Sequence, residues 1–166
     1  MPAQSLDAVD LEILSALQED GRMTNVDLAA RVGLTAPPCL RRVRSLEQAR
    51  VIRGYHARLD PAALGYSITV FAMVSLKSQA EHELRAFEEH VAGLPQVREC
   101  HMLNGEIDFI LKIVAPDLQS FQHFLTSELT TAPNVASVKT SLTIRTSKDS
   151  PGVPIAGAAP SFDRDG

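Results

Sequence analysis

The stretch TNVDLAARVGLTAPPCLRRVRSLEQ, residues 24–48, decides the N-terminal fold of this chain. Thr24 and Asp27 stand at the spacing of a helix N-cap and an acidic third helical residue, and Gly33 supplies a left-handed residue that ends the helix. Thr35 then caps a further helix, whose first turn tolerates a double proline because its N–H groups lack intrahelical partners. Two short helices joined by so few residues predict a helix-turn-helix.

A preceding helix is expected over residues 8–19. Asp7 and Asp10 have the spacing of a capping box, and Leu6 and Leu11 flank them at the spacing of a hydrophobic staple. The three helices together predict a small N-terminal domain within residues 1–60.

The helix after the double proline has two different faces. The apolar residues recur at helical spacing and are expected to pack inward: Cys39, Leu40, Val43 and Leu46. The opposite face carries Pro37, Arg41, Arg44, Ser45 and Gln48, with Arg42 at the boundary. In a helix-turn-helix this second helix enters the major groove, and arginine suits guanine edges or phosphates. Arg41 and Arg42 are therefore the leading candidates for contact with DNA.

Positive charge gathers around this helix although the whole chain carries a net charge of -4. Residues 41–58 contain six arginines against one glutamate, whereas residues 61–166 contain 8 basic and 12 acidic side chains. The segment 51–60 keeps basic residues and alternates like a β-ribbon, which predicts a wing. The predicted DNA contacts are Thr35, Ala36, Pro37, Pro38, Arg41, Arg42, Arg44, Ser45, Arg50 and Arg53.

The sequence changes character after residue 60. The turn-rich stretch DPAALG places a domain boundary between residues 60 and 61. The elements expected beyond it are a strand over 67–76, a helix over 81–92, strands over 97–103 and 107–114, a helix over 118–130 and a strand over 135–146. This order predicts an α+β chain in which a ferredoxin-like βαββαβ domain spans residues 61–146. Residues 147–166, with scattered prolines and no period, are interpreted as a disordered tail.

Two features of the predicted sheet have consequences for assembly. Asn104 and Gly105 between the middle strands are typical of a tight hairpin. The strands over 67–76 and 107–114 are apolar on both faces, although the open face of such a sheet should be polar. Because monomers rarely expose a large apolar patch, we expect a second copy of the chain to cover it as a homodimer.

Short motifs recur in a fixed order along the chain: LDAVDLEIL at 6–14, DGR at 20–22, DLA at 27–29, VGLT at 32–35, LRRV at 40–43, LE at 46–47, VIRGY at 51–55, LG at 64–65 and GEID at 105–108. Single motifs are weak signals, but their order and spacing are specific. From residue 6 to about residue 146, the chain resembles the Lrp/AsnC (feast/famine) family of transcription regulators.

The resemblance implies a winged helix-turn-helix followed by a ligand-responsive domain that forms dimers and often octamers. Amino acids or related metabolites are the usual effectors, bound between dimers near the turn matching 105–108. Asp108 could then accept hydrogen bonds from an α-ammonium group, and backbone N–H groups in this turn could meet the carboxylate. The candidate effector contacts are Leu103, Asn104, Gly105, Glu106, Asp108, Thr131, Ala132, Asn134, Ser137 and Thr140. The residues alone favour a simpler role for Asp108, as a hairpin-end carboxylate bonded to local backbone.

One position departs from the family pattern. Arg50 stands where these regulators usually have a glycine between the recognition helix and the wing. A left-handed non-glycine residue costs on the order of 1 kcal/mol. Either the turn differs here or the extra cation compensates at the DNA backbone.

Other classes of function find little support. The five histidines show no metal-ligand spacing, and no phosphate-binding loop or nucleophile motif occurs, so neither an enzyme nor a metal cofactor is expected. No uncharged run is long enough to span a bilayer, the start does not resemble a signal peptide, and Cys39 and Cys100 form no CxxC pair, so we expect two small buried thiols in a reduced, cytoplasmic compartment. The alternative to a DNA-binding regulator is a metabolite-sensing oligomer that acts through a protein partner.

Overall fold

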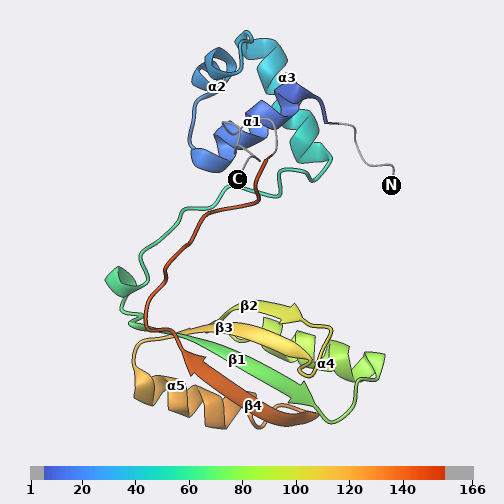
Figure 1. Cartoon of the computed structure of the whole chain (residues 1–166), viewed down its shortest axis with the longest axis vertical. Coiled ribbons are helices and arrows are strands. Elements are labelled where there is room, and N and C mark those ends of the chain that lie inside the picture. The colour runs from blue at the N-terminus through green and yellow to red at the C-terminus, as the bar shows by residue number, and fades with distance from the viewer. Residues whose placement is uncertain (1–5, 156–166) are drawn as a thin grey trace, which may run out of the picture. The chain divides into compact units, whose positions relative to one another are not determined.

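The computed structural model describes residues 6–155, which divide into two units (Figure 1). The first unit contains the chain up to Arg58 together with the segment from Lys148 onward, and the second contains Leu59–Ser147. Each unit has a hydrophobic core of its own.

The first unit is built on α1 (Ala8–Glu19), α2 (Asn25–Arg31) and α3 (Ala36–Gln48). The predicted capping box is present, because the Asp10 N–H donates to Asp7 Oδ1 at 2.8 Å and the Asp7 N–H donates to Asp10 Oδ2 at 3.2 Å. The core shared by the three helices consists of Ile13, Ala16, Leu28, Ala29, Val32, Cys39, Val43 and Leu46. The helix-turn-helix predicted from the capping residues is confirmed.

The turn between α2 and α3 follows the predicted chemistry with one difference. Gly33 has a φ of 68°, and the next N–H, that of Leu34, donates to the Ala29 carbonyl at 2.8 Å, which closes α2 in a Schellman motif. Thr35 is the N-cap residue of α3, but its side chain makes no capping hydrogen bond within the described chain. The reason is local: the second and third helical positions are prolines, which have no N–H to donate.

Two expectations for the first unit were wrong. Within the described chain, residues 51–60 form no strand, because their backbone groups make no ladder of hydrogen bonds with another segment. Leu40, expected in the core, is 36% exposed on α3. The wing is therefore an extended segment without a strand partner.

The second unit contains β1 (Ile68–Leu76), α4 (Glu81–Ala92), β2 (Val97–Met102), β3 (Phe109–Ala115), α5 (Leu118–Phe124) with a π-helical extension (Leu125–Leu129), and β4 (Val135–Leu142). A single turn of 3-10 helix, Ala62–Leu64, precedes β1. The four strands are antiparallel in the order β2-β3-β1-β4, and α4 and α5 cover one face (Figure 1). The predicted ferredoxin-like α+β domain is confirmed.

The core of this unit lies between the sheet and the two helices. Alternate residues of β1 and β3 point to the helices and are buried, among them Val70, Val74, Leu111 and Ile113. The Phe87 ring of α4 lies 4.8 Å from the Phe109 ring of β3, centroid to centroid, at an interplanar angle of 40°. The remaining residues of β1 and β3 form the open face of the sheet.

The connection between β2 and β3 is longer than predicted. It covers residues 103–108, and the Leu103 N–H donates to the Asp108 carbonyl at 2.8 Å. A two-residue type I′ turn requires positive φ at both central residues, and neither Asn104 nor Gly105 has one. The hairpin is present, but its turn is a six-residue loop.

Two further expectations concern thiols and membranes. Cys39 is buried as expected, but Cys100 is exposed, because β2 is an edge strand with little cover. No helix of the described chain is both long enough and apolar enough to cross a membrane.

Candidate functional site

The exposed face of α3 carries two unpaired arginines. Arg41 and Arg44 are both exposed, and among the described residues neither guanidinium group forms an ion pair or a hydrogen bond. An unpaired guanidinium keeps all its donors for an external acceptor. The other predicted contacts on this helix are its N-cap Thr35 and, within it, Ala36, Pro37, Pro38 and Ser45.

Arg42 differs from its neighbour. Its Nη1 atom lies 2.8 Å from Asp7 Oδ2 and 2.7 Å from Asp10 Oδ1, and Asp10 is only 8% exposed. The backbone hydrogen bond from Asp10 and the Arg42 guanidinium together lower the pKa of Asp7. The sequence placed Arg42 beside Arg41 as a leading contact, whereas the structure shows it fastening α3 to the start of α1.

Arg50 keeps the left-handed turn that a glycine would favour. Its φ is 59°, its N–H donates to the Glu47 carbonyl at 3.0 Å, and the Val51 N–H donates to the Leu46 carbonyl at 3.0 Å. These two bonds form a second Schellman motif. The turn therefore does not differ, and the arginine is held in a strained conformation where its exposed side chain follows α3.

The extended segment after Arg50 is tied back to the same helix. The Tyr55 hydroxyl donates to Glu47 Oε1 at 3.0 Å, and burial together with this carboxylate raises the pKa of Tyr55 to about 12. Arg53 is exposed in this segment. The basic segment 50–53 is thus fixed close to the C-terminal end of α3.

In the second unit, Asp108 is buried and fully engaged. It is 7% exposed, the Leu76 N–H donates to its Oδ2 at 2.7 Å, and Gln79 Nε2 donates to its Oδ1 at 2.7 Å. Its own N–H donates to the Val74 carbonyl at 3.0 Å. The carboxylate therefore bonds backbone, as the simpler interpretation held, but on β1 and not within its own hairpin.

Asn134 has a similar role on the other side of the same segment. It has a φ of 65°, its Nδ2 donates to the Ser78 carbonyl at 2.8 Å, and its carbonyl accepts the Lys77 N–H at 2.8 Å. Residues 76–79 thus lie between the 103–108 loop and the segment 131–134. The structure brings these two predicted groups together at the end of the sheet where β1 ends.

The remaining effector candidates are divided between this end and β4. Leu103, Asn104, Gly105 and Glu106 are exposed in the loop, Ala132 is buried, and the Thr131 hydroxyl donates to the Ser127 carbonyl at 2.6 Å. Ser137 and Thr140 are exposed along β4, opposite Ser75 and Ala72 of β1. Sequence reasoning missed Ser78 and Gln79, although polar residues directly after an apolar strand were an available signal.

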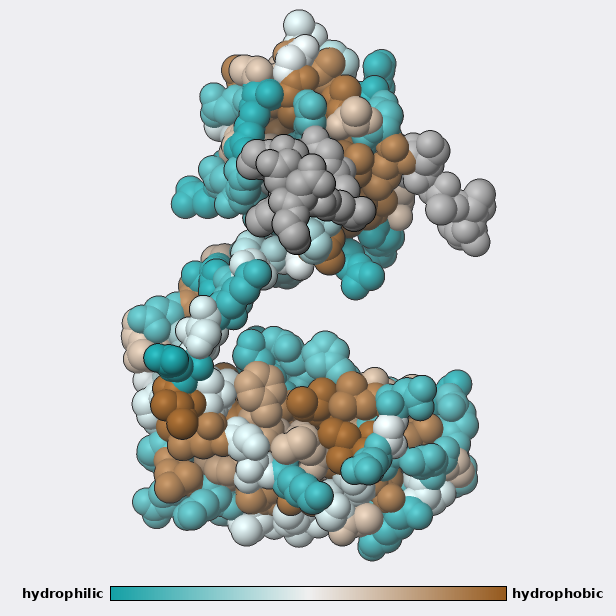
Figure 2. All heavy atoms as spheres, viewed as in Figure 1, coloured by the Kyte–Doolittle hydropathy of each residue, from teal (hydrophilic) through white to brown (hydrophobic). Residues whose placement is uncertain are grey.

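The open face of the sheet has a narrow apolar strip. Phe71, 37% exposed, lies there with the less exposed Met73, Ile110 and Val114. Lys112 lies among them and bonds Glu99 of β2 at 2.8 Å. In Figure 2, apolar side chains gather over the strands of this unit, bordered by hydrophilic ones. Only the two central strands, β1 and β3, are therefore apolar on both faces. On the open face, polar residues surround their apolar side chains.

The described residues contain no group of three or more His, Cys, Asp or Glu side chains placed to hold a metal ion.

Comparison with known proteins decides between the classes of function. Residues 6–53 match the model of a winged helix-turn-helix DNA-binding domain, and residues 69–153 match the Lrp/AsnC ligand binding domain. The chain is 57% identical over 144 residues to the leucine-responsive regulatory protein of Rhizobium meliloti. This alignment covers 87% of this chain and 92% of that protein. The chain belongs to the Lrp/AsnC family.

Two further relatives are also transcription regulators. The Bkd operon transcriptional regulator of Pseudomonas aeruginosa is 45% identical over 140 residues, covering 84% of this chain and 92% of its own. A transcriptional regulator of Neisseria meningitidis, solved in complex with L-Met, superposes with a TM-score of 0.87 at 35% identity, covering 92% of this chain and 98% of that one. This Lrp/AsnC protein is a DNA-binding transcription regulator with an effector-binding domain, and the expectation that it is not an enzyme is confirmed.

Proposed function

We propose that this regulator reads duplex DNA with the exposed face of α3 and that an amino acid, bound at the end of the sheet, alters its activity or assembly. The observation that supports DNA reading most directly is that Arg41 and Arg44 stand exposed and unpaired on one helix face. Arg50 and Arg53 follow that helix and add positive charge beside it.

Arg41 is the residue we assign to base contact, since planar bidentate donors suit the guanine edge in the major groove. Arg42 is assigned a positioning role, because both of its carboxylate partners belong to the start of α1. Arg44, Arg50 and Arg53 are assigned to phosphates, where a point of positive charge fixes the helix in the groove.

The effector site is assigned to the exposed loop residues 103–106 and the neighbouring start of β4. The N–H groups of Asn104, Gly105 and Glu106 donate to no acceptor within the described chain, so they are available to an effector carboxylate. Asp108 positions this loop, because its carbonyl accepts the Leu103 N–H while its carboxylate is bonded to Leu76 and Gln79. It is not itself assigned to the effector. One relative is named for leucine and one related structure contains L-Met, so we propose an aliphatic amino acid as the effector.

A homodimer is assigned to the open face of the sheet. An apolar centre of Phe71, Met73, Ile110 and Val114 surrounded by polar side chains is the usual composition of a protein interface. A two-fold dimer would present its two α3 helices to DNA half-sites about 34 Å apart. Effector binding between such dimers would then favour one higher assembly, such as an octamer, over another.

The test uses fluorescence anisotropy with a labelled duplex from the chain's own promoter region, together with a thermal-shift screen of the amino acids. A ligand that binds only the folded chain raises its melting temperature, and at a hundredfold excess over Kd the stabilisation is about 2.7 kcal/mol. We expect saturable duplex binding that weakens with salt, and a melting-temperature rise with L-leucine or L-methionine. A chain that ignores duplex DNA in dilute salt would contradict the proposal.

A further inference from the structure

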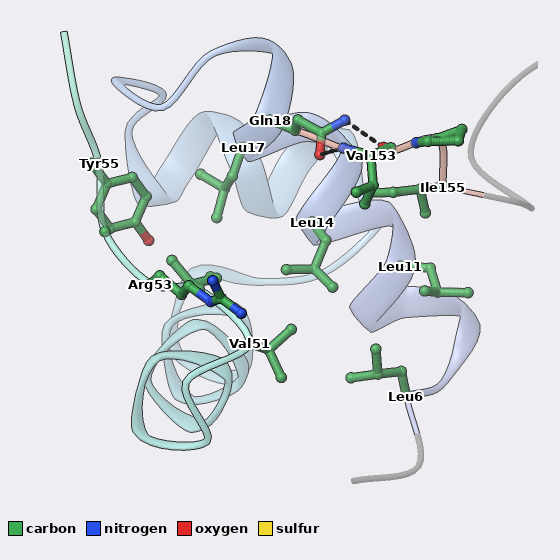
Figure 3. Close-up of a pocket in the computed structure, with 13 residues that line it drawn as sticks. Leu6, Leu11, Leu14, Leu17, Gln18, Val51, Arg53, Tyr55, Val153 and Ile155 are labelled. Carbon is green, nitrogen blue, oxygen red and sulfur yellow. Dashed lines mark hydrogen bonds between the residues drawn. The ribbon is translucent and has the colours of Figure 1, made fainter. Parts of the chain in front are cut away.

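The segment after β4 docks on the DNA-binding unit. Gln18 of α1 holds it by a reciprocal pair of hydrogen bonds, in which Gln18 Nε2 donates to the Val153 carbonyl at 2.8 Å and the Val153 N–H donates to Gln18 Oε1 at 3.1 Å (Figure 3). A side-chain amide paired in this way imitates one rung of a β-ladder. The sequence led us to expect a disordered tail over 147–166, and residues 148–155 differ from that expectation; residues 156–166 lie outside the described residues.

The docked segment also lines an apolar cavity on this unit. Val153, Pro154 and Ile155 border a cavity of about 620 Å³ whose opposite walls are the leucines of α1 and residues 51–55 (Figure 3). The cavity is therefore formed by three segments distant in sequence: α1, the extended segment after α3, and the tail. Each segment contributes apolar side chains to the lining of the cavity, and Val153 itself remains 66% exposed.

A polar contact holds the start of the same segment. Arg58 Nη1 donates to the Asp149 carbonyl at 3.0 Å, and the Arg58 guanidinium forms an ion pair with the Asp149 carboxylate. Arg58 is the last residue of the first unit before the chain enters the sheet domain. Arg58 and Asp149 thus fasten to one another the two points at which the chain leaves and re-enters the first unit.

We propose that residues 148–155 are a latch: α1 and residues 51–55 form a docking surface for the chain's own C-terminal segment, and the docked latch transmits changes in β4 to the DNA-binding unit. β4 begins at the end of the sheet assigned to the effector, and residues 143–147 connect it to the latch. The helix on which the latch docks also holds Arg42 of α3 through Asp7 and Asp10. This inference rests on the proposed function, because the coupling it describes is between effector and DNA.

The experiment compares Gln18→Ala and Ile155→Asp with wild type in the full-length chain. Gln18→Ala removes both hydrogen bonds and leaves the best helix-forming residue in α1, whereas Ile155→Asp places a charge at a half-buried position in the lining of the apolar cavity. The matched control is Ile144→Asp, which adds the same charge to a residue that is 96% exposed in the preceding connector. Hydrogen exchange of the residue 153 amide reports docking, and anisotropy with promoter duplex, with and without L-leucine or L-methionine, reports coupling.

We expect the residue 153 amide to exchange faster in both variants but not in the control. In wild type and control, the amino acid should change the duplex Kd by a factor in the range of about 5 to 150 that is typical of coupled sites. In both variants this factor should fall to about 1 while the thermal shift with the amino acid persists. An unchanged factor in a variant whose tail has been released would overturn the latch alone.

Two further outcomes are decisive. Protection of the residue 153 amide that rises with chain concentration would show the tail docking on a second copy, and would overturn a latch within one chain. Wild-type chain that fails to bind duplex would overturn the proposed function itself, and the latch with it.

Discussion

The two units of this regulator use their polar side chains in opposite ways. On α3, Arg41 and Arg44 are exposed and unpaired, so their donors remain available to an external partner. In the sheet domain, Asp108 and Asn134 have their polar atoms bonded to the backbone of residues 76–78 and to Gln79. Residue type and position identified both sets as candidates. A candidate contact must therefore also have unoccupied hydrogen-bonding groups.

The same distinction separates two adjacent residues of one helix. Arg41 and Arg42 have the same chemistry, but Arg42 is bonded to Asp7 and Asp10 and Arg41 is not. The rotation of about 100° per helical residue turns one guanidinium toward α1 and the other toward solvent. Substitutions at these positions therefore separate binding from folding.

The largest effect is expected at the open face of the sheet. Phe71→Asp would bury an uncompensated charge in the proposed dimer interface, with a penalty of about 3 to 5 kcal/mol, so the dimer should dissociate at micromolar concentration. Light scattering measures the mass. Leu118→Asp, at a residue that is 55% exposed at the start of α5, is the control and should remain dimeric. A monomeric mass for the wild-type chain would contradict the assigned interface.

The next effect tests whether Asp108 belongs to the fold or to the effector. Asp108→Ala leaves the Leu76 N–H and the Gln79 amide without an acceptor, so the free energy of unfolding should fall by about 2 to 4 kcal/mol in chemical denaturation. Asp108→Asn, which keeps one acceptor oxygen, should lose less. Unchanged stability together with a lost response to the amino acid would instead make Asp108 a direct effector contact.

Much of the fold was accessible from sequence because its signals are local. The caps at Asp7 and Thr24 and the stop at Gly33 each act within one helical turn, and the period of the strands follows from which side faces a core. The features that the sequence did not predict depend on tertiary contacts. Periodicity does not reveal that Arg42 forms ion pairs with carboxylates more than 30 residues away, nor that Val153 is hydrogen-bonded to Gln18. The structure brings the loop candidates near Asp108 and the candidates around Asn134 to one end of the sheet, but the sequence could not reveal their hydrogen bonds to residues 76–79.

The two Schellman turns provide a smaller, matched comparison. Gly33 and Arg50 both have a left-handed φ, 68° and 59°, but only the glycine adopts it without strain. Arg50→Gly should raise the free energy of unfolding by about 1 kcal/mol, and Gly33→Ala should lower it by about the same amount. Urea denaturation measures both. A loss of stability in Arg50→Gly would show that the Arg50 side chain contributes contacts that outweigh the strain.

The smallest expected effect is on how the stability of the fold depends on pH in the acid range. Because the folded-state pKa of Asp7 is lowered, its stabilisation is fully present above the unfolded-state pKa, near 3.8, and is lost as pH falls through the folded-state value. Thermal melts between about pH 2 and pH 6 should therefore differ between wild type and Asp7→Asn above pH 4 and converge below it. Curves that remain parallel throughout this range would contradict the Asp7–Arg42 contact.

The central claim is that the unpaired arginines of α3 read DNA, and the most direct measurement is promoter-duplex affinity of Arg41→Ala against wild type and Arg42→Ala. We predict that Arg41→Ala loses about 1 to 3 kcal/mol of binding free energy with an unchanged melting temperature. Arg42→Ala should lower the melting temperature of the DNA-binding unit, because Asp7 and Asp10 lose their partner. Undiminished affinity in a folded Arg41→Ala chain would contradict the claim.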